Sequence, residues 1–365
     1  MKKIVVAGTN DLAHNITNLI DLGTSEVVAY LINPEISDDA KAYPVVTYRE
    51  LPNLEHDYVI VTDGGDQLPL GQPIIDLRTF ISTYYNFEIY RAIAAIKTVD
   101  RSTRGFVTGL SYAEVGIDAD ELPFPLINLA VSSQDLFYDF QFAKYLFSTS
   151  EWASNIRYAL ISLAYYSFHY DLSRSSIGSR SLMYYPFVRT LHHFDAGREL
   201  DLLHEFEEKI EGVFRSDYLT ELFHILKKRD ESWWVRMVNG RLNERKIKAA
   251  REQAQKDSRK NYPLTVKENI QILTDYIRLL KRYDVEPTLV VCPAQIYYNQ
   301  FLSARIKNEF YQIAQQICTT HDVPLLDYFD SDLFRDEDFY DPTHLNSQGA
   351  KKFTRMLRNH WWSKN

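Results

Sequence analysis

The stretch GFVTGLSYAEVGID, residues 105 to 118, decides the predicted fold. Its apolar start is typical of a buried strand, and Gly109 breaks that strand just before Ser111. In an α/β sheet, a tight turn at the carboxyl end of a strand is where a side chain meets a ligand. The stretch is not a G-x-S-x-G turn, because Ala113 stands where the second glycine would be. Ser111 is therefore a candidate nucleophile at the end of a sheet strand.

The next chemically suggestive stretch is INLAVSSQDLFYD, residues 127 to 139. It predicts a second strand, a serine-rich turn and the start of a helix. Ser132 or Ser133 is the expected cap of that helix, since a hydroxyl oxygen accepts from the first free backbone N–H groups. Those N–H groups could face an anion.

The α/β pattern resumes in the last hundred residues. Apolar residues at helical spacing predict a helix that begins near residue 263, and the strand TLVVC follows at residues 288–292. A further helix is expected over residues 303–320, and the strand VPLLDYF over residues 323–329. The segment DPTHLN, residues 341–346, then leads into a last helix.

Asp341 and His344 in this segment form a candidate acid–base pair. A neutral imidazole takes a hydroxyl proton well only if an acceptor holds its other nitrogen, which fixes its tautomer and orientation. An aspartate three residues earlier in a turn can do this locally. The free nitrogen would then face a serine from a distant strand, and Ser111 is the candidate.

Together, TGLSYAEVG and the D-x-x-H of residues 341–344 resemble the SGNH (GDSL-like) hydrolase superfamily. The resemblance covers about residues 101–150 and 263–365. Within the superfamily, the chain looks most similar to the D-alanyl transfer proteins of lipoteichoic acid biosynthesis. In those proteins a strand ends in P-x-N, and the stretch CPAQIYYNQF approximates this pattern. The resemblance implies a serine esterase or acyltransferase that forms an acyl-enzyme and acts on acyl or acetyl esters of a carbohydrate or cell-surface precursor.

The resemblance also assigns roles to single residues. Ser111 would be the nucleophile, His344 the base and Asp341 the residue that orients it. The backbone N–H groups of Ser111 and Ser133, with the Gln295 side chain, would bind the oxyanion. The chain departs from the family's sequence blocks at three places. Leu110 stands at the position of the Asp in the first block, and Gln295 stands at that of the Asn in the third block. The Gly of the second block falls near Ser132 or Ser133.

The first hundred residues predict a separate Rossmann-like domain, with apolar runs that begin at Lys3, Glu26, Asp57 and Gln72 as parallel strands. The turn after the first strand keeps Gly8 of the dinucleotide fingerprint but has Asn10 at the middle glycine, which impedes the approach of a pyrophosphate. No dinucleotide is therefore expected. In coarse pattern the region resembles the small N-terminal domains of sugar O-acyltransferases that bind nucleotide-sugars.

The predicted organisation is thus α/β, with a Rossmann-like domain at residues 1–100 and an SGNH-hydrolase-like three-layer α/β/α domain at residues 101–365. Dense aromatic residues predict a helical insertion in the second domain, at about residues 151–262. The HHFDAG segment in this insertion (His192, His193 and Asp195) could contain metal ligands. Because no third cluster stands at ligand spacing, we interpret these residues as structural and expect no metal and no cofactor.

Composition limits the partners. The 365 residues have a formal net charge of −8, which disfavours nucleic-acid binding, since phosphate contacts need clustered Lys and Arg. Cys292 and Cys318 stand in no metal spacing and indicate a reducing compartment. With neither a signal sequence nor a membrane span in the pattern, we expect a cytoplasmic protein. Substrate identity and oligomeric state are not predicted.

Two other functions stay open at this point. The N-terminal domain could bind a nucleotide or nucleotide-sugar and carry the function. Alternatively, the chain could be a catalytically inactive interaction protein on the same fold, as the altered residues around Ser133 and Gln295 would allow.

Overall fold

The computed structural model describes residues 1–31, 43–65, 68 and 71–362. The chain divides into two compact units, Met1–Tyr90 with Asp195–Glu231, and Arg91–Phe194 with Ser232–Asn365. The division thus falls near residue 90 instead of 100, and part of the predicted insertion belongs to the first unit.

The first unit contains a five-stranded parallel sheet. Its order is β3 (Val45–Val46), β2 (Ser25–Leu31), β1 (Lys2–Ala7), β4 (Tyr58–Val61) and β5 (Ile74–Asp76). This is the 3-2-1-4-5 order of doubly wound folds. The strand β1 is central because it pairs on both sides, and its residues from Ile4 to Ala7 are buried. The four predicted strands are confirmed.

Helices of different lengths accompany this sheet. The helix after β1 is the four-residue α1 (Asp11–His14), followed by a 3₁₀ turn at Ile16–Asn18. The other helices of this unit are α2 (Leu77–Thr83) and α7 (Arg198–Ile210), and α3 (Phe87–Lys97) and α8 (Tyr218–Val238) cross its boundary.

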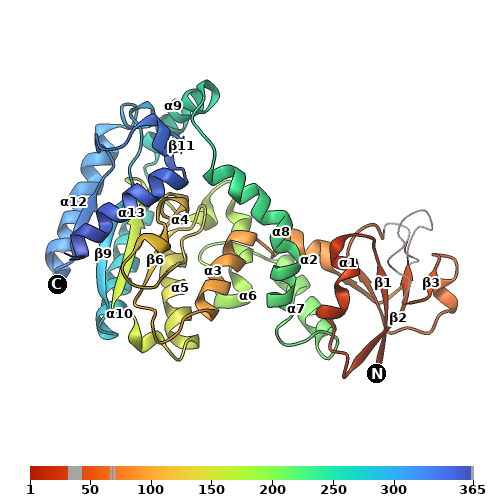
Figure 1. Ribbon diagram of the computed structural model, residues 1–365. Helices are drawn as coiled ribbons and strands as arrows, with labels where there is room; N and C mark the ends of the chain where they lie inside the picture. Colours follow the sequence, from red (N-terminus) through yellow and green to blue (C-terminus); the bar gives the residue numbers. More distant parts are fainter. Residues whose placement is uncertain (32–42, 66–67, 69–70, 363–365) are drawn as a thin grey trace. The chain divides into compact units, whose positions relative to one another are not determined.

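The second unit is built on another parallel sheet (Figure 1). Its order is β10 (Leu325–Asp327), β9 (Glu286–Val291), β8 (Tyr158–Leu163), β6 (Gly105–Thr108) and β7 (Leu126–Asn128). Counted along the chain, this is the order 2-1-3-4-5 of a doubly wound sheet, with its switch point between β6 and β8. Ligands bind at the carboxyl ends of the strands near such a point.

Helices cover both faces of this sheet, as the alternation of side chains along β6 shows. Val107 belongs to a buried cluster with Ala113 of α4 (Ser111–Gly116) and Phe353 of α13 (Ser347–Trp362). On the opposite face, Phe106 contacts the Phe147 ring of α5 (Leu136–Thr149), and the Thr108 hydroxyl lies 3.1 Å from the Tyr276 hydroxyl of α10 (Pro263–Arg282). The unit therefore has three layers.

The prediction of a helical insertion from residue 151 was wrong for its first part, because Tyr158–Leu163 form the strand β8 at the centre of the sheet. A strand that is buried on both faces is a continuous apolar run, and it cannot be told from a buried helix by periodicity alone. Short 3₁₀ turns follow at Ser167–His169, Leu172–Arg174 and Gly178–Met183. The remaining helices of the unit are α6 (Tyr185–Val188), α9 (Glu244–Arg259), α11 (Ile296–Asn299) and α12 (Ala304–His321).

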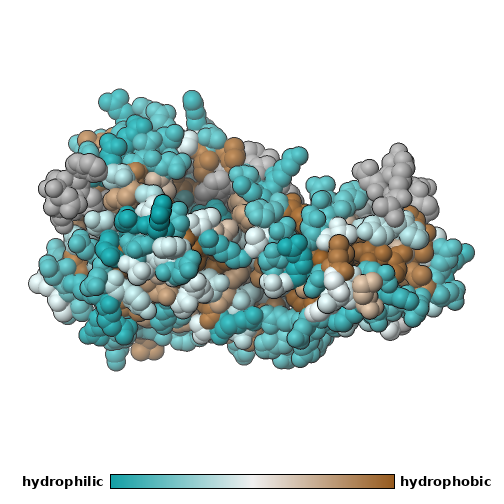
Figure 2. All heavy atoms as spheres, turned by 60° about the horizontal axis from the view of Figure 1, so that its bottom comes forward, coloured by the Kyte–Doolittle hydropathy of each residue, from teal (hydrophilic) through white to brown (hydrophobic). Residues whose placement is uncertain are grey.

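Hydrophilic side chains predominate on the face of the molecule shown in Figure 2. Within the described ranges, no helix is both long enough and apolar enough to cross a membrane.

Candidate active site

Ser111 is the first residue of α4, directly beyond the carboxyl end of β6. The chain turns at Gly109, whose φ is 137°, a value that L side chains rarely adopt. A Cβ at this position would lie 2.7 Å from both Cβ and the carbonyl oxygen of Ser162 in the neighbouring strand β8. Only glycine fits this close approach, and the turn it permits places the Ser111 hydroxyl above the switch point of the sheet.

Asp341 and His344 face each other across a tight hairpin. β11 (Phe339–Asp341) pairs with β12 (His344–Leu345), and the two residues are register partners. The Asp341 carboxylate accepts hydrogen bonds from the backbone N–H groups of Thr343 (2.9 Å) and His344 (3.0 Å). Its two oxygens each lie 2.9 Å from Nδ1 of His344. The turn therefore holds the carboxylate against the imidazole, as the sequence indicated.

The hairpin brings this imidazole to the serine. His344 Nε2 lies 2.7 Å from Ser111 Oγ. With Nδ1–H donated to Asp341, Nε2 has the free lone pair that accepts the serine proton. Burial raises the pKa of Asp341, but the charge and hydrogen bonds of His344 outweigh it, with help from Thr343, and hold that pKa at about 2. The carboxylate is thus ionised at neutral pH.

A cavity of about 790 Å³ opens beside Ser111. Ser133 also lines it, from the segment after β7, and so do residues from the 3₁₀ turns and from the end of α9. Tyrosine rings and charged side chains share its wall: Tyr166, Tyr170, Tyr262, Asp257 and Lys260. This volume lies within the ~300–1,000 Å³ of small-molecule sites.

The two serines of the turn after β7 differ in their surroundings. Ser133 has a φ of 64°, and its carbonyl accepts a hydrogen bond from the Tyr170 hydroxyl at 3.0 Å. The Ser132 hydroxyl instead donates to the buried Glu114 carboxylate at 2.7 Å. Neither serine caps α5, which was the expectation, because the Asp135 side chain accepts from its first turn. Of the two, Ser133 is the one at the cavity.

Gln295 lies at the carboxyl end of a different strand, β9, and precedes α11. Its backbone N–H donates to the carbonyl of Pro342 at 2.7 Å, within the Asp341–His344 turn. The side chain is buried, and its Nε2 has no hydrogen-bond partner among the described residues. Gln295 is not among the residues that line the cavity beside Ser111.

Sequence reasoning missed the residues that build the far wall of this cavity. Lys260 forms an ion pair with the buried Asp257 and lies 4.4 Å above the Tyr166 ring. A Lys three residues after an Asp near a helix end is common on exposed helix faces, so neither residue stood out as part of a site. No local signal distinguishes this pair; only the packing of α9 against α11 does.

The turn after β1, which begins at Gly8, is occupied by side chains of the first unit itself. The Thr9 N–H donates to both carboxylate oxygens of Asp63, at 3.0 and 3.1 Å. Asn10 caps α1 through Oδ1 and donates from Nδ2 to the carbonyl of Thr62. A carboxylate at this turn repels phosphate and uses an N–H group that a phosphate would need. These contacts weigh against nucleotide binding at this turn.

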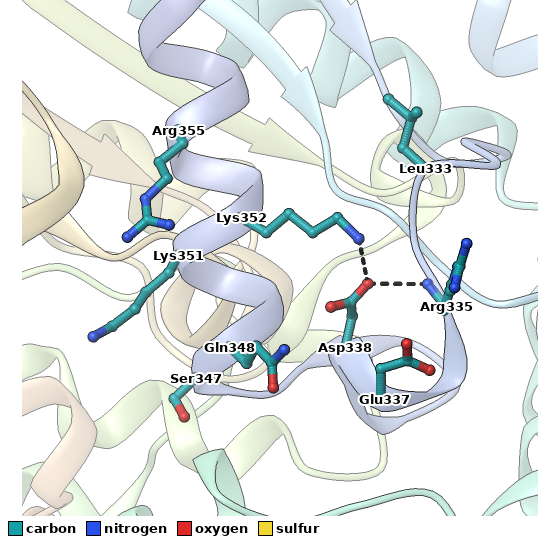
Figure 3. A pocket seen from close by; sticks show the side chains of 9 residues that line it. All are labelled: Leu333, Arg335, Glu337, Asp338, Ser347, Gln348, Lys351, Lys352 and Arg355. Carbon is teal, nitrogen blue, oxygen red and sulfur yellow. Dashed lines mark hydrogen bonds and ion pairs between the residues drawn. The ribbon is translucent and has the colours of Figure 1, made fainter.

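A second hollow, of about 660 Å³, lies at the N-terminal half of α13 (Figure 3). It is rich in basic side chains, but Lys352 forms an ion pair with Asp338 at 2.7 Å, and Arg355 one with Glu121 at 2.7 Å. The Asp338 carboxylate also accepts from the Arg335 backbone N–H. Because these charged groups are paired with one another, we place the candidate active site at Ser111 and not at this hollow.

Comparisons with known proteins name no family for this chain. No model of a known protein family matches it, and no curated protein does either. A psychrotrophic esterase, EstA from Pseudoalteromonas sp., solved with monoethylphosphonate as inhibitor, is 13% identical. The match covers 72% of this chain and 100% of the esterase chain, with a TM-score of 0.35. A TM-score of this size does not establish a shared fold.

Proposed function

We propose that the protein is a serine esterase or acyltransferase of the SGNH type, which works through Ser111, His344 and Asp341. The observation that carries the proposal is the continuous chain of contacts between them, 2.7 Å from serine to imidazole and 2.9 Å from imidazole to carboxylate. A serine, a base and a group that orients the base are the arrangement that activates a hydroxyl for acyl transfer.

In this mechanism, Ser111 Oγ attacks the ester carbonyl carbon while His344 Nε2 takes the hydroxyl proton. The tetrahedral intermediate expels the alcohol, which receives that proton from His344. Water or a second alcohol then attacks the acyl-serine, again with His344 as base, and frees the enzyme. Asp341 holds the imidazole and stabilises its positive charge, without itself taking up a proton.

The oxyanion would be bound by backbone N–H groups at Ser111 and Ser133. Both residues line the cavity, and neither N–H group has an acceptor in the hydrogen bonds of the described ranges. The positive φ of Ser133, which the Tyr170 hydrogen bond supports, sets the direction of its peptide group. Donors fixed in advance stabilise developing charge without reorganisation.

The substrate we propose is an acyl or acetyl ester on a carbohydrate or cell-surface precursor. The cavity offers aromatic rings with hydroxyl groups, such as Tyr170 and Tyr262, beside the charged pair of Asp257 and Lys260. Such a wall suits a sugar, which presents apolar C–H faces and hydroxyl groups together.

A fluorophosphonate probe followed by peptide mass spectrometry tests this proposal. We expect one labelled residue, Ser111, because only its hydroxyl faces a base among the serines that line the cavity. Ser111→Ala should abolish labelling. Ser176→Ala is the matched control, since Ser176 is exposed and lines the same cavity but is not part of the proposed machinery.

Equal labelling of the wild type and the Ser111→Ala variant would refute the assignment. The absence of any label, in a protein that remains folded, would favour the catalytically inactive interaction protein.

Gln295 remains the proposed side-chain donor to the oxyanion. Its buried, unpartnered Nε2 supports this role, whereas its position outside the cavity lining does not. If Nε2 donates, Gln295→Leu should lower kcat by ~10²–10³-fold with KM nearly unchanged, because the bond strengthens only in the transition state. Gln295→Asn, which keeps an amide, should retain more activity. Wild-type kcat in the Leu variant would mean that backbone N–H groups alone bind the oxyanion.

A further inference from the structure

Four metal-ligating side chains meet in the second unit, outside the proposed triad. They are Asp171, His192, His193 and Glu268, and one ligand atom from each lies within 4.8 Å of all the others. Asp171 precedes a 3₁₀ turn, the two histidines follow α6, and Glu268 belongs to α10. The cluster therefore joins three segments that are distant in sequence.

Asp171 faces the Nδ1 side of both imidazoles. Its Oδ2 lies 2.8 Å from His193 Nδ1, and its Oδ1 lies 3.6 Å from His192 Nδ1. An ionised carboxylate on this side favours the proton on each Nδ1 and leaves the lone pair on each Nε2.

Glu268 faces the Nε2 side. Its Oε1 lies 3.1 Å from His192 Nε2 and 3.4 Å from His193 Nε2, and the two rings are tilted by 31° with centroids 4.0 Å apart. Around a tetrahedral zinc ion with bonds of ~2.0–2.2 Å, neighbouring donor atoms are ~3.3–3.5 Å apart. The two distances from Glu268 Oε1 to the histidine nitrogens are thus close to the spacing that a zinc ion requires, and the ligand atoms of the cluster all lie within 4.8 Å of one another.

Two atoms of the cluster are buried without a hydrogen bond among the described residues, Asp171 Oδ1 and His192 Nδ1. Their side chains are only 3% and 7% exposed. Buried polar atoms are nearly always paired, and exceptions concentrate at functional sites. Glu268, at 38% exposure, opens the other side of the cluster to solvent, so that an ion can enter there.

We propose that Nε2 of His192, Nε2 of His193 and Oε1 of Glu268 bind a Zn²⁺ ion, with Asp171 as the carboxylate behind the histidines. Two histidines and a glutamate are a known zinc ligand set that leaves a fourth position for water or a ligand. Carboxylates behind ligating histidines fix their orientation and strengthen their binding. The inference is independent of the proposed esterase activity.

This site replaces the sequence interpretation of HHFDAG. The two histidines and Glu268 are the proposed ligands, Asp171 is the carboxylate behind the histidines, and Asp195 is not part of the cluster. Asp171 also lines the cavity beside Ser111. A bound ion would therefore tie together three segments and hold that part of the cavity wall.

Zinc binding is measured on the full chain after dialysis against a chelator. We expect one Zn²⁺ per chain in competition with a chromophoric chelator, and a higher Tm with zinc, because an ion that binds only the folded state stabilises it. His193→Ala and Glu268→Gln should abolish this binding and the rise in Tm. Both side chains are partly exposed, so these variants are expected to fold.

Two further variants sharpen the test. Asp171→Asn should weaken binding by ~10–100-fold, as for other residues behind a metal ligand. His14→Ala, which removes an exposed imidazole of α1 outside the cluster, should bind zinc like the wild type. A wild-type protein that takes up no zinc at micromolar free ion overturns the proposal. So does unchanged binding in both His193→Ala and Glu268→Gln, which would place the ion elsewhere.

Discussion

Replacing Ser111 by Ala is expected to lower kcat for a simple ester by ~10⁴–10⁶-fold, and His344→Ala by a similar factor. The two side chains act as one unit, since Ser111 Oγ is only 2.7 Å from the base that takes its proton. The double variant should therefore be hardly slower than either single variant. Steady-state kinetics of the three variants measure this non-additivity, which distinguishes a catalytic pair from two independent contacts.

The Ser111→Ala variant should keep the wild-type Tm within a few degrees, because a partly exposed hydroxyl at a helix start contributes little to stability. Additive losses from Ser111→Ala and His344→Ala, or a Ser111→Ala enzyme with more than a tenth of wild-type kcat, would contradict the mechanism.

Asp341→Asn is expected to lower kcat by up to ~10⁴-fold while the hairpin stays folded. The carboxylate accepts Nδ1–H of His344, whereas an amide can turn its NH₂ toward Nδ1 and select the wrong tautomer. The backbone bonds from Thr343 and His344 can still be made to the remaining amide oxygen. Kinetics at neutral pH measure the effect. An unchanged rate would mean that Asp341 and His344 belong to an ordinary surface turn.

The same variant has a defined dependence of stability on pH. The pKa of Asp341 is lowered to about 2 in the folded protein from the ordinary aspartate value of 3.8. A lowered folded-state pKa adds stability above the unfolded-state pKa, and that stability is lost as pH falls through the folded-state pKa. The stability advantage of the wild type over Asp341→Asn should therefore be full at pH 5 and shrink between about pH 4 and pH 2. Urea unfolding at several pH values measures this.

Features that depend on neighbouring residues were predictable from the sequence. The turn serine after β6 and the Asp–x–x–His hairpin each need only a few adjacent residues, and Ser111, Asp341 and His344 do meet. The strands β1, β2, β4, β6, β9 and β10 were likewise visible as short apolar runs between turns.

What the sequence did not predict depends on contacts between distant segments. β8 resembles a helix until its pairing with β6 and β9 is known. The Asp257–Lys260 pair looks like surface charge until α9 packs over the cavity. The other two members of the cluster around His192 and His193 are not in the same segment of the sequence. Asp171 and Glu268 lie 21 and 76 residues away from His192.

The central position of β8 also has a consequence during synthesis on the ribosome. β8 ends at Leu163, but its second neighbour, β9, begins only at Glu286. At ~5–20 residues per second, the ribosome needs on the order of ten seconds to synthesise the residues between β8 and β9. During this time, one edge of the apolar strand β8 has no partner. Unpaired edges of this kind recruit other chains. The nascent chain should therefore need a chaperone more than its finished, fully paired sheet suggests. When the protein is refolded from denaturant, slow dilution should take the place of the chaperone.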